Sequence, residues 1–313
     1  AKVLPALRRG NVVGALQLGL RPGAFAPGTS EVLDGIGILG AAADGKIDLL
    51  VLLGADPLAD CPDSDLARRA LAGARRVIAV DTFLTDSAAT ADVVFAAAAF
   101  GEQSGTTTNL EGRVTSVAEK VTPAGTARPD WMVAAELAER LGHDDLASRL
   151  WSVEAITDEI ATTVPAYSAA TSAAIATAVD GVLAVPASTG TVGRADGAPT
   201  VTDRVSYDYR LVITRKLYDR AIGTAMSPSL ASLAAAGAAT VHPLDLARLG
   251  IETGADVQLI GHRGSVVLPI AASVGVPQGS VHVPFNVAGA SATDIVDATS
   301  AVHDVRIERL ADR

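Results

Sequence analysis

With 313 residues, the chain is long enough for two domains that each bury a core of their own. The formal net charge of −10 argues against a nucleic-acid partner, because phosphate binding depends on clustered Lys and Arg. Aromatic residues make up only 4% of the chain, so the core must consist mainly of Ala, Val, Leu and Ile. Cys61 is the only cysteine, which leaves neither an internal disulfide nor a cysteine-ligated iron–sulfur cluster within these residues.

Residues 47–99 alternate between apolar runs and short helical patterns. The run "IDLLVLLGADP", from residue 47, is apolar until it ends in turn formers, which is typical of a strand buried on both faces. The stretch 62–74 predicts a helix, "RRVIAVD" a second strand, 82–91 a short helix and "DVVFAAA" a third strand. This alternation, with right-handed crossovers, predicts a parallel, doubly wound α/β sheet.

Residues that favour ligand binding stand where the first two of these strands end. They are Gly54, Asp56, Asp81 and Thr85, and open α/β sheets bind ligands at the carboxyl ends of their strands. Asp56, Asp81 and Asp86 are candidates for a catalytic cluster of carboxylates. Asp56 and Asp81 are equally typical of turns and helix N-caps, so both interpretations stay open.

The segment "GEQSGTTTNLEGRVT" (101–115) follows an almost wholly apolar run, "ADVVFAAAAF". It consists largely of glycine, threonine and other small polar residues. Loops that bind a phosphate or a pterin have this composition, and so do plain β-hairpins. Composition alone does not separate the two.

Helical patterns continue beyond this segment. Residues 129–142, "PDWMVAAELAERLG", predict an amphipathic helix that ends at a glycine. Residues 154–180 predict Ala-rich helix that Pro165 interrupts. The stretch 185–204 is rich in Pro, Gly, Ser and Thr, and we place a surface linker there, at the end of a first domain of residues 1–184.

The second domain, residues 205–313, has the texture of a β protein. Strands are predicted in "YRLVITRKLYD", twice in "ADVQLIGHRGSVVLPIAAS" around an "HRGS" turn, and in "GSVHVPFNV", with a short helix in "HPLDLARLGI". Short strands with one or two small helices predict a compact barrel. The uncharged stretch 265–293 contains several prolines and glycines, so it does not predict a membrane-spanning helix.

The histidines and the cysteine do not predict a metal site. His143, His262, His282 and His303 show no H-x-x-H or E-x-x-H spacing. The fifth, His242, precedes a proline and is more typical of a helix cap than of a ligand. Cys61 precedes a predicted helix start, where a thiol can be activated, but we interpret it as a small apolar filler.

Several motifs in order resemble one family. "LLGADPLADCPD", "VDTFLTDSAATADVV", "GTTTNLEGRV" and "ARPDWMVAAELAERLG" together resemble the molybdopterin oxidoreductase superfamily, which includes formate dehydrogenases. "HPLDLARLGIETGADVQLIGHRGSV" is similar to the C-terminal dinucleotide-binding domain of that superfamily, a double-psi β-barrel. The resemblance implies a doubly wound parallel-sheet domain followed by a double-psi β-barrel domain.

Within the superfamily, the motifs most resemble the branch of the large iron–sulfur (G) subunit of NADH-quinone oxidoreductase, respiratory complex I. The opening "AKVLPALRRG" is typical of a domain interior, so we expect an upstream part of the same chain. The branch implies that 2Fe–2S and 4Fe–4S clusters are bound in that upstream part. It further implies a scaffold in the peripheral arm of a proton-translocating complex, on the cytoplasmic side of the plasma membrane, among other peripheral-arm subunits. The Ala-rich composition resembles actinobacterial versions.

For this segment, the branch implies no catalytic residue, no metal site and no bound cofactor. The positions that match the pterin site of molybdenum enzymes are then vestigial, and they are Gly54, Asp56, Asp81, Thr85, Gly105, Asn109 and Gly112. Two departures support this interpretation. Catalytic relatives usually have Leu-Pro where this chain reads "VVFAAAAF", and an "A-N-x-L-T" segment where it has Thr293 and Val296.

The resemblance also implies roles within the segment 101–115. Gly105 allows close backbone approach, Asn109 and Gly112 tolerate left-handed turn geometry, and Glu111 can accept a backbone hydrogen bond. We favour an inherited hairpin that seats one lobe against the other. Two alternatives remain: an active molybdenum or tungsten bis-molybdopterin oxidoreductase such as a formate dehydrogenase, with its metal ligand upstream, and a free-standing nucleotide-binding module.

Overall fold

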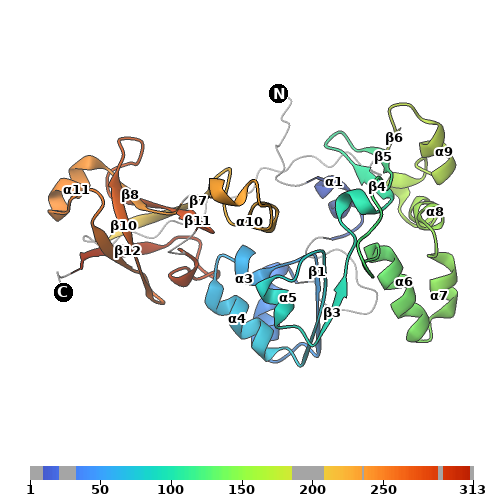
Figure 1. The fold of residues 1–313 in the computed structure, drawn as a ribbon, viewed down its shortest axis with the longest axis horizontal. Helices are drawn as coiled ribbons and strands as arrows, with labels where there is room; N and C mark the ends of the chain where they lie inside the picture. The colour runs from blue at the N-terminus through green and yellow to red at the C-terminus, as the bar shows by residue number, and fades with distance from the viewer. Residues whose placement is uncertain (1–9, 21–32, 185–207, 235, 288–291, 311–313) are drawn as a thin grey trace. The chain divides into compact units, whose positions relative to one another are not determined.

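The computed structural model describes residues 10–20, 33–184, 208–234, 236–287 and 292–310. The chain divides into two compact units (Figure 1). The first unit contains residues 1–38, 80–83 and 93–194, and the second contains residues 39–79, 84–92 and 195–313. The predicted linker, 185–204, lies outside the described residues, and the domain boundary stays a prediction.

A three-stranded parallel sheet has the predicted alternation of strands and helices. Its strands, in the order β1-β2-β3, are β1 (Leu49–Leu53), β2 (Arg76–Asp81) and β3 (Val93–Ala96). The helices around them are α2 (Gly35–Ala43), α3 (Pro57–Asp60), α4 (Ser64–Gly73) and α5 (Asp86–Ala89). Asp63 caps α4 by accepting a hydrogen bond from the backbone N–H of Leu66 at 2.9 Å, which explains why this helix begins there.

The helices described around β1 cover one face of the strand. Leu50 and Leu52 are buried in a core with residues of α2, α4 and α5, namely Ala42, Ala70 and Ala88. On the opposite face, Leu49, Val51 and Leu53 are each more than half exposed. The prediction that this strand is buried on both faces is therefore wrong for the described residues, because an apolar sequence shows that a face can be buried but not what covers it.

The first unit contains an antiparallel sheet and a group of helices. The strands, in order, are β4 (Gly105–Thr108), β5 (Arg113–Val117) and β6 (Val182–Leu183). The helices are α1 (Val12–Gln17), α6 (Asp130–Arg140), α7 (Asp144–Arg149), α8 (Val153–Thr163) and α9 (Ser172–Thr177). Pro165 opens a 3₁₀ turn, η2 (Pro165–Tyr167), so the predicted interruption of the helix is confirmed. The core of this sheet contains Val114, Tyr167 and Ile175.

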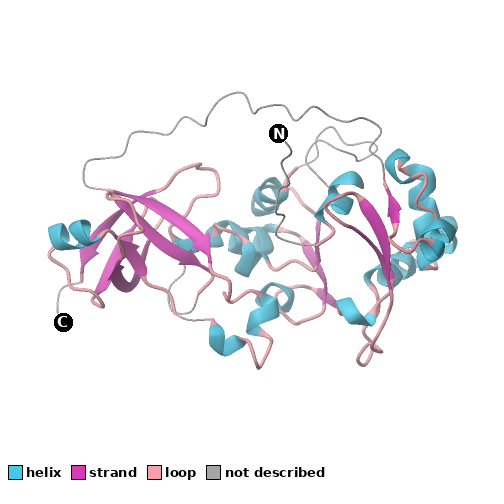
Figure 2. Ribbon diagram, turned by 90° about the horizontal axis from the view of Figure 1, so that it is seen from above, coloured by secondary structure: helices cyan, strands magenta, loops and turns pink. Residues whose placement is uncertain are grey.

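A closed barrel of six strands occupies the C-terminal part of the second unit (Figure 2). Around the barrel the order is β10-β8-β11-β7-β12-β9. The strands are β7 (Tyr209–Arg215), β8 (Ala239–Val241), β9 (Asp256–Ile260), β10 (Ser265–Ala272), β11 (Ser280–Phe285) and β12 (Asp304–Arg309), with short helical turns α10 (Ile222–Ala225), η3 (Ala231–Leu233) and η4 (Ala292–Asp294). The predicted barrel is confirmed. β8 was not predicted because its apolar pattern is too short, and β12 was not predicted because its sequence is too highly charged.

The helix of the barrel, α11 (Pro243–Leu249), has the predicted ends. Leu244 donates its backbone N–H to Nδ1 of His242 at 3.1 Å, so His242 caps the helix as predicted. Gly250 ends it in the left-handed conformation, with φ of 64°. Within the described part of the chain, no helix has the length and apolar character that crossing a membrane requires.

Candidate functional site

The predicted residues of the α/β sheet lie at strand ends. Gly54 follows β1 with a φ of 55°, and Asp56 is the N-cap residue of α3. Asp81 is the last residue of β2, where its carboxylate accepts the backbone N–H of Phe83 at 3.3 Å. Thr85 caps α5, with its hydroxyl accepting the backbone N–H of Ala88 at 3.0 Å. The side chains of Asp81 and Thr85 thus take part in a local turn and a helix cap.

Asp56 contacts a residue that the sequence did not single out. The Oγ of Ser87 donates a hydrogen bond to Oδ1 of Asp56 at 2.5 Å and accepts the backbone N–H of Leu58 at 3.0 Å. Ser87 is fully buried, and this bond joins the end of β1 to α5. Asp86 is exposed in the first turn of α5. The contact of Asp81 supports its turn interpretation, whereas the Asp56 carboxylate makes no cap hydrogen bond and bonds to Ser87 instead.

Two buried polar atoms at the start of α6 lack a hydrogen-bond partner among the described residues. They are Oδ1 of Asp130 and Nε1 of Trp131. Burial raises the pKa of Asp130, and the nearby carboxylate of Asp81 raises it further. The sequence pattern placed these two residues in a helix and indicated no further role for them.

The turn between β4 and β5 is organised by Asn109. Its Oδ1 accepts the backbone N–H groups of Glu111 and Arg113, both at 2.9 Å. Gly112 has the predicted left-handed backbone, with φ of 83°. Asn109 does not, since only Asn11 and Asn286 have positive φ among the described non-glycine residues. The prediction for Asn109 is wrong because its side chain, rather than its backbone, makes the turn.

Two further expectations for this segment are corrected. At Gly105, an added Cβ would meet no described atom within 4 Å, so nothing described approaches it closely. Glu111 does not accept a backbone hydrogen bond in the described contacts, and its carboxylate lies 3.7 Å from the guanidinium of Arg113 at an exposed site. Neither residue is constrained by the hairpin itself.

The strand β4 is attached to α1 and η2 by polar contacts. The backbone N–H of Thr108 donates to Oδ1 of Asn11 at 2.8 Å, and the Thr108 hydroxyl lies 2.8 Å from the hydroxyl of Tyr167. Tyr167 also donates to Oε1 of Gln17 at 3.0 Å. The polar side chains of this hairpin are thus largely engaged within the first unit.

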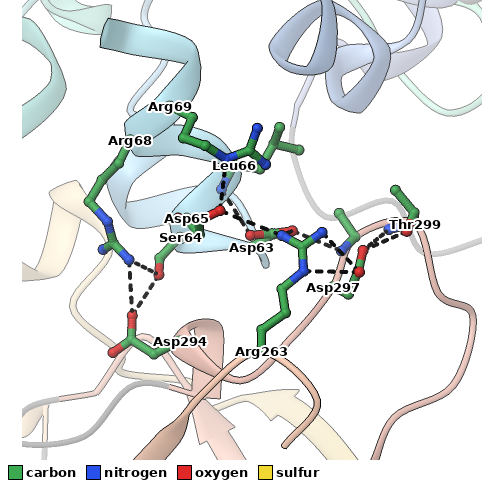
Figure 3. A network of polar contacts seen from close by, with 11 residues as sticks. Asp63, Ser64, Asp65, Leu66, Arg68, Arg69, Arg263, Asp294, Asp297 and Thr299 are labelled. Atoms are coloured by element: carbon green, nitrogen blue, oxygen red, sulfur yellow. Dashed lines mark hydrogen bonds and ion pairs between the residues drawn. The ribbon is translucent and has the colours of Figure 1, made fainter. Parts of the chain in front are cut away.

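A polar network in the second unit joins α4 to the barrel (Figure 3). Oδ2 of Asp63 accepts hydrogen bonds from Nη1 of Arg263 at 2.9 Å and from the backbone N–H of Ala298 at 3.1 Å. Asp63 is only 1% exposed. Arg263 belongs to the predicted "HRGS" turn between β9 and β10.

Arg263 also binds a second carboxylate, that of Asp297. Its Nε and Nη2 atoms lie 2.9 Å and 2.8 Å from Oδ2 of Asp297. Oδ1 of Asp297 accepts hydrogen bonds from the hydroxyl and the backbone N–H of Thr299. These Thr299 bonds, with the Arg263 guanidinium, lower the pKa of Asp297 to about 2.

Two further contacts join this part of the chain to the barrel segment. The hydroxyl of Ser64 donates to Oδ1 of Asp294 at 2.6 Å. Arg215 donates from Nη2 to Oδ1 of Asp60 at 2.6 Å. The sequence did not reveal the network, because its partners are far apart in the chain; only the "PDSD" helix start was a local signal for Asp63.

The cysteine matches its interpretation as a small buried side chain. Cys61 is buried, and burial raises the pKa of its thiol, which disfavours the reactive thiolate. In the part of the chain that the structure describes, no group of three His, Cys, Asp or Glu residues is placed to hold a metal ion.

Comparison with known families agrees with the fold. Residues 7–140 match the family model described as molybdopterin oxidoreductase, and residues 209–305 match the molydopterin dinucleotide binding domain. The two segments together make up more than half of the chain. The α/β sheet followed by a closed barrel is the arrangement that these two domains imply, and the chain belongs to the molybdopterin oxidoreductase family.

Curated relatives include subunits of several oxidoreductases. The chain is 31% identical to the NADPH-Fe(3+) oxidoreductase subunit alpha of Geobacter sulfurreducens, over 98% of this chain and 37% of that protein. It is 31% identical to the G 2 subunit of the NADH-quinone oxidoreductase of Rhizobium meliloti, over 89% and 34%. It is 27% identical to the F420-dependent formate dehydrogenase 1 subunit alpha of Methanococcus maripaludis, over 80% and 40%. The chain therefore spans little more than a third of the length of such relatives.

A solved structure supports the same fold. The acetylene hydratase from Pelobacter acetylenicus matches with a TM-score of 0.60 at 16% identity, over 88% of this chain and 46% of that one. At this identity the similarity establishes the fold alone.

The family implies a molybdopterin dinucleotide, whose phosphates need an anion site. In an open α/β sheet, the N-terminus of the helix after a strand is such a site. The N-terminus of α4, which follows β1 after the one-turn helix α3, is filled by the carboxylate of Asp63, with Asp65 beside it in the first turn. A phosphate placed there would meet two carboxylates. The residues at this helix end do not fit the phosphates of a dinucleotide.

Proposed function

We propose that this chain is part of the large iron–sulfur subunit of a respiratory, proton-translocating NADH:quinone oxidoreductase, where it acts as a scaffold rather than as a catalytic site. The proposal is supported by the 31% identity to the NADH-quinone oxidoreductase protein of Rhizobium meliloti. The three curated relatives named above are all subunits of oxidoreductases or dehydrogenases, which supports the broader assignment of this chain to an oxidoreductase subunit. The scaffold role is what separates this proposal from the alternative below.

The observation that carries the scaffold role is the filled N-terminus of α4. Asp63 accepts three hydrogen bonds from protein donors, so that helix end stabilises the protein itself. The hairpin agrees with this, because Asn109 and Thr108 bond within the first unit. Of the predicted pterin-site positions, Asn109 uses its side chain within the hairpin, which supports a structural role for it.

In this proposal the chain stiffens and shields the upstream part of its own subunit, which carries the 2Fe–2S and 4Fe–4S clusters. Electrons pass from NADH through these clusters toward quinone, and a rigid scaffold keeps the clusters at fixed distances. The partners are the neighbouring subunits of the peripheral arm, on the cytoplasmic side of the plasma membrane. This segment binds no molybdopterin, and its pterin-site positions are vestigial.

Elemental analysis of the intact complex, purified from its source, tests the proposal. We expect iron in amounts that match several clusters, with no stoichiometric molybdenum or tungsten. The purification fractions that contain the complex should also catalyse the NADH-dependent reduction of a soluble quinone. Stoichiometric molybdenum or tungsten bound to this subunit would contradict the proposal.

The second candidate is a subunit of an active molybdenum or tungsten oxidoreductase, such as a formate dehydrogenase. It is supported by the 27% identity to the formate dehydrogenase subunit of Methanococcus maripaludis. The structural observation that favours it is the pair of buried atoms on Asp130 and Trp131 that have no hydrogen-bond partner among the described residues and that a bound polar group could satisfy. Formate oxidation by the purified complex, together with bound molybdenum or tungsten, would establish it.

A further inference from the structure

Three donors from separate segments converge on the carboxylate of Asp63 (Figure 3). The backbone N–H of Leu66 comes from the first turn of α4, at 2.9 Å from Oδ1. Nη1 of Arg263 comes from the β9–β10 turn, at 2.9 Å from Oδ2, and the backbone N–H of Ala298 comes from the loop after η4, at 3.1 Å from Oδ2. Two of the three donors are therefore on barrel loops, at sequence separations of 200 and 235 positions.

These are the groups from which proteins build anion sites. A helix N-terminus supplies a partial positive charge and free N–H groups, and a guanidinium supplies a full positive charge. A loop N–H adds a directional hydrogen bond to the anion. The carboxylate they surround is almost completely buried, while the Arg263 side chain is 27% exposed. The site therefore has the composition of an anion pocket, but its occupant is a side chain of the same protein.

The surroundings explain why no free anion competes in the native protein. Asp65 lies 3.7 Å from Arg263, and Asp297 takes the remaining face of the same guanidinium. With three carboxylates around one arginine, a second anion would be repelled. Removal of Asp63 alone would leave the two N–H groups and one face of the guanidinium without an acceptor in a buried place.

We propose that the N-terminus of α4, Arg263 and the Ala298 N–H form an anion site that the protein occupies with its own Asp63, and that this occupancy fastens the barrel loops to α4. A small free anion binds there only when the Asp63 side chain is missing. The inference goes beyond the proposed function, since it holds whether the complete protein is a scaffold or an active molybdenum enzyme.

The test is chemical rescue in the full-length protein, read by hydrogen exchange in peptides that cover residues 62–68 and 294–300. In Asp63→Gly, both peptides should exchange roughly 10- to 100-fold faster than in the wild type, because each loses a hydrogen bond to a charged acceptor. Sodium formate should restore protection in both peptides together, with a saturable dependence on concentration. Sodium chloride at equal ionic strength should not.

Matched variants separate a specific site from general salt effects. Asp65→Gly removes an exposed carboxylate two residues further along the chain, and it should show no formate-specific change in residues 294–300. Asp63→Gly combined with Arg263→Ala should lose the rescue, because the charged donor is gone. If Asp63→Gly does not fold in sodium chloride, the yield of folded protein is measured instead of hydrogen exchange. That yield should be higher in sodium formate than in sodium chloride.

Three results would overturn the inference. One is equal protection of both peptides in formate and in chloride. Another is wild-type exchange in residues 294–300 after Asp63→Gly, which would mean that Asp63 does not fasten the barrel loop. The third is a saturable effect of inorganic phosphate on the wild-type protein at these peptides, since the site would then be open to free anions.

Discussion

Gly105 and Gly112 stand seven positions apart in one hairpin, yet their backbones differ in what they require. Gly112 has a φ of 83°, and an added Cβ would lie 3.1 Å from the backbone oxygen of Ala184. Gly105 lies in an extended strand, and an added Cβ would meet no described atom within 4 Å. The sequence suggested a need for glycine at both positions, for close backbone approach at Gly105 and for left-handed geometry at Gly112, and the structure supports only the second.

Substitution of these two glycines by valine should therefore have unequal effects. Gly112→Val should lower the free energy of unfolding by roughly 1–3 kcal/mol through backbone strain, whereas Gly105→Val is the matched control and should change it little. Urea unfolding followed by fluorescence, together with the folded yield, measures both. A large fall in the free energy of unfolding of Gly105→Val would contradict this expectation and would indicate that a group outside the described residues packs against that strand.

The contacts of Asp297 lead to a prediction about pH. Its pKa falls from an ordinary value of 3.8 to about 2, so the folded state favours the ionised form. The stability that this group contributes is fully present above about pH 4, declines as the pH falls below 3.8, and is lost once the pH passes below about 2. Thermal unfolding of the wild type should thus depend more steeply on pH across this window than unfolding of Asp297→Asn. Parallel curves for the two proteins would show that the contacts with Thr299 and Arg263 do not persist in solution.

At the scale of elements, the β4–β5 hairpin is held by its own turn. The strands pair from Gly105 with Val117 to Thr108 with Val114. The side chain of Asn109 closes the turn with two backbone hydrogen bonds. Glu111, in the same turn, only approaches Arg113 at an exposed site. The turn thus depends on one amide side chain and one glycine.

Asn109→Ala should lower the free energy of unfolding by about 1–2 kcal/mol, because two backbone N–H groups lose their acceptor. Glu111→Gln is the matched control, with an expected change within about 0.5 kcal/mol, since a surface ion pair contributes little. Urea denaturation measures both. Under the scaffold proposal, NADH oxidation per assembled complex stays unchanged in either variant. A large fall in turnover by Asn109→Ala with assembly intact would instead assign the hairpin a role in the chemistry.

At the scale of the whole molecule, one face of β1 is exposed among the described residues, and under the proposed function we expect it to be a contact surface. Leu49, Val51 and Leu53 form a stripe of apolar side chains on one side of the strand. Exposed stripes of this kind are typical of surfaces that pack against other protein. Strands of parallel sheets are usually covered on both faces. We expect the upstream part of the same subunit to cover this stripe.

Val51→Lys should then impair assembly of the complex without unfolding the sheet, because the lysine would be buried at the contact. Val274→Lys, at a strongly exposed valine of the barrel, is the matched control and should have no effect. The amount of neighbouring subunits that co-purify with each variant measures assembly, and circular dichroism checks the fold. Normal assembly of Val51→Lys would show that the stripe is exposed to solvent in the complete protein.

Local patterns in the sequence were enough to predict the order of elements and the class of fold. Strand and helix patterns between residues 47 and 99, four of the six barrel strands and both ends of α11 were readable because each depends on hydrogen bonds and side chains within a few neighbouring positions. The family resemblance rested on the same local motifs, and the two matched family models agree with it.

Which of these residues meet depends on tertiary packing. The burial of one face of β1, the bond between Ser87 and Asp56, and the convergence of Leu66, Arg263 and Ala298 on Asp63 all require contacts between distant segments. An aspartate before a helix has the same local pattern whether its second oxygen faces water or an arginine 200 positions away. That choice is made by the packing of the barrel loops on α4, which no short stretch of the sequence encodes.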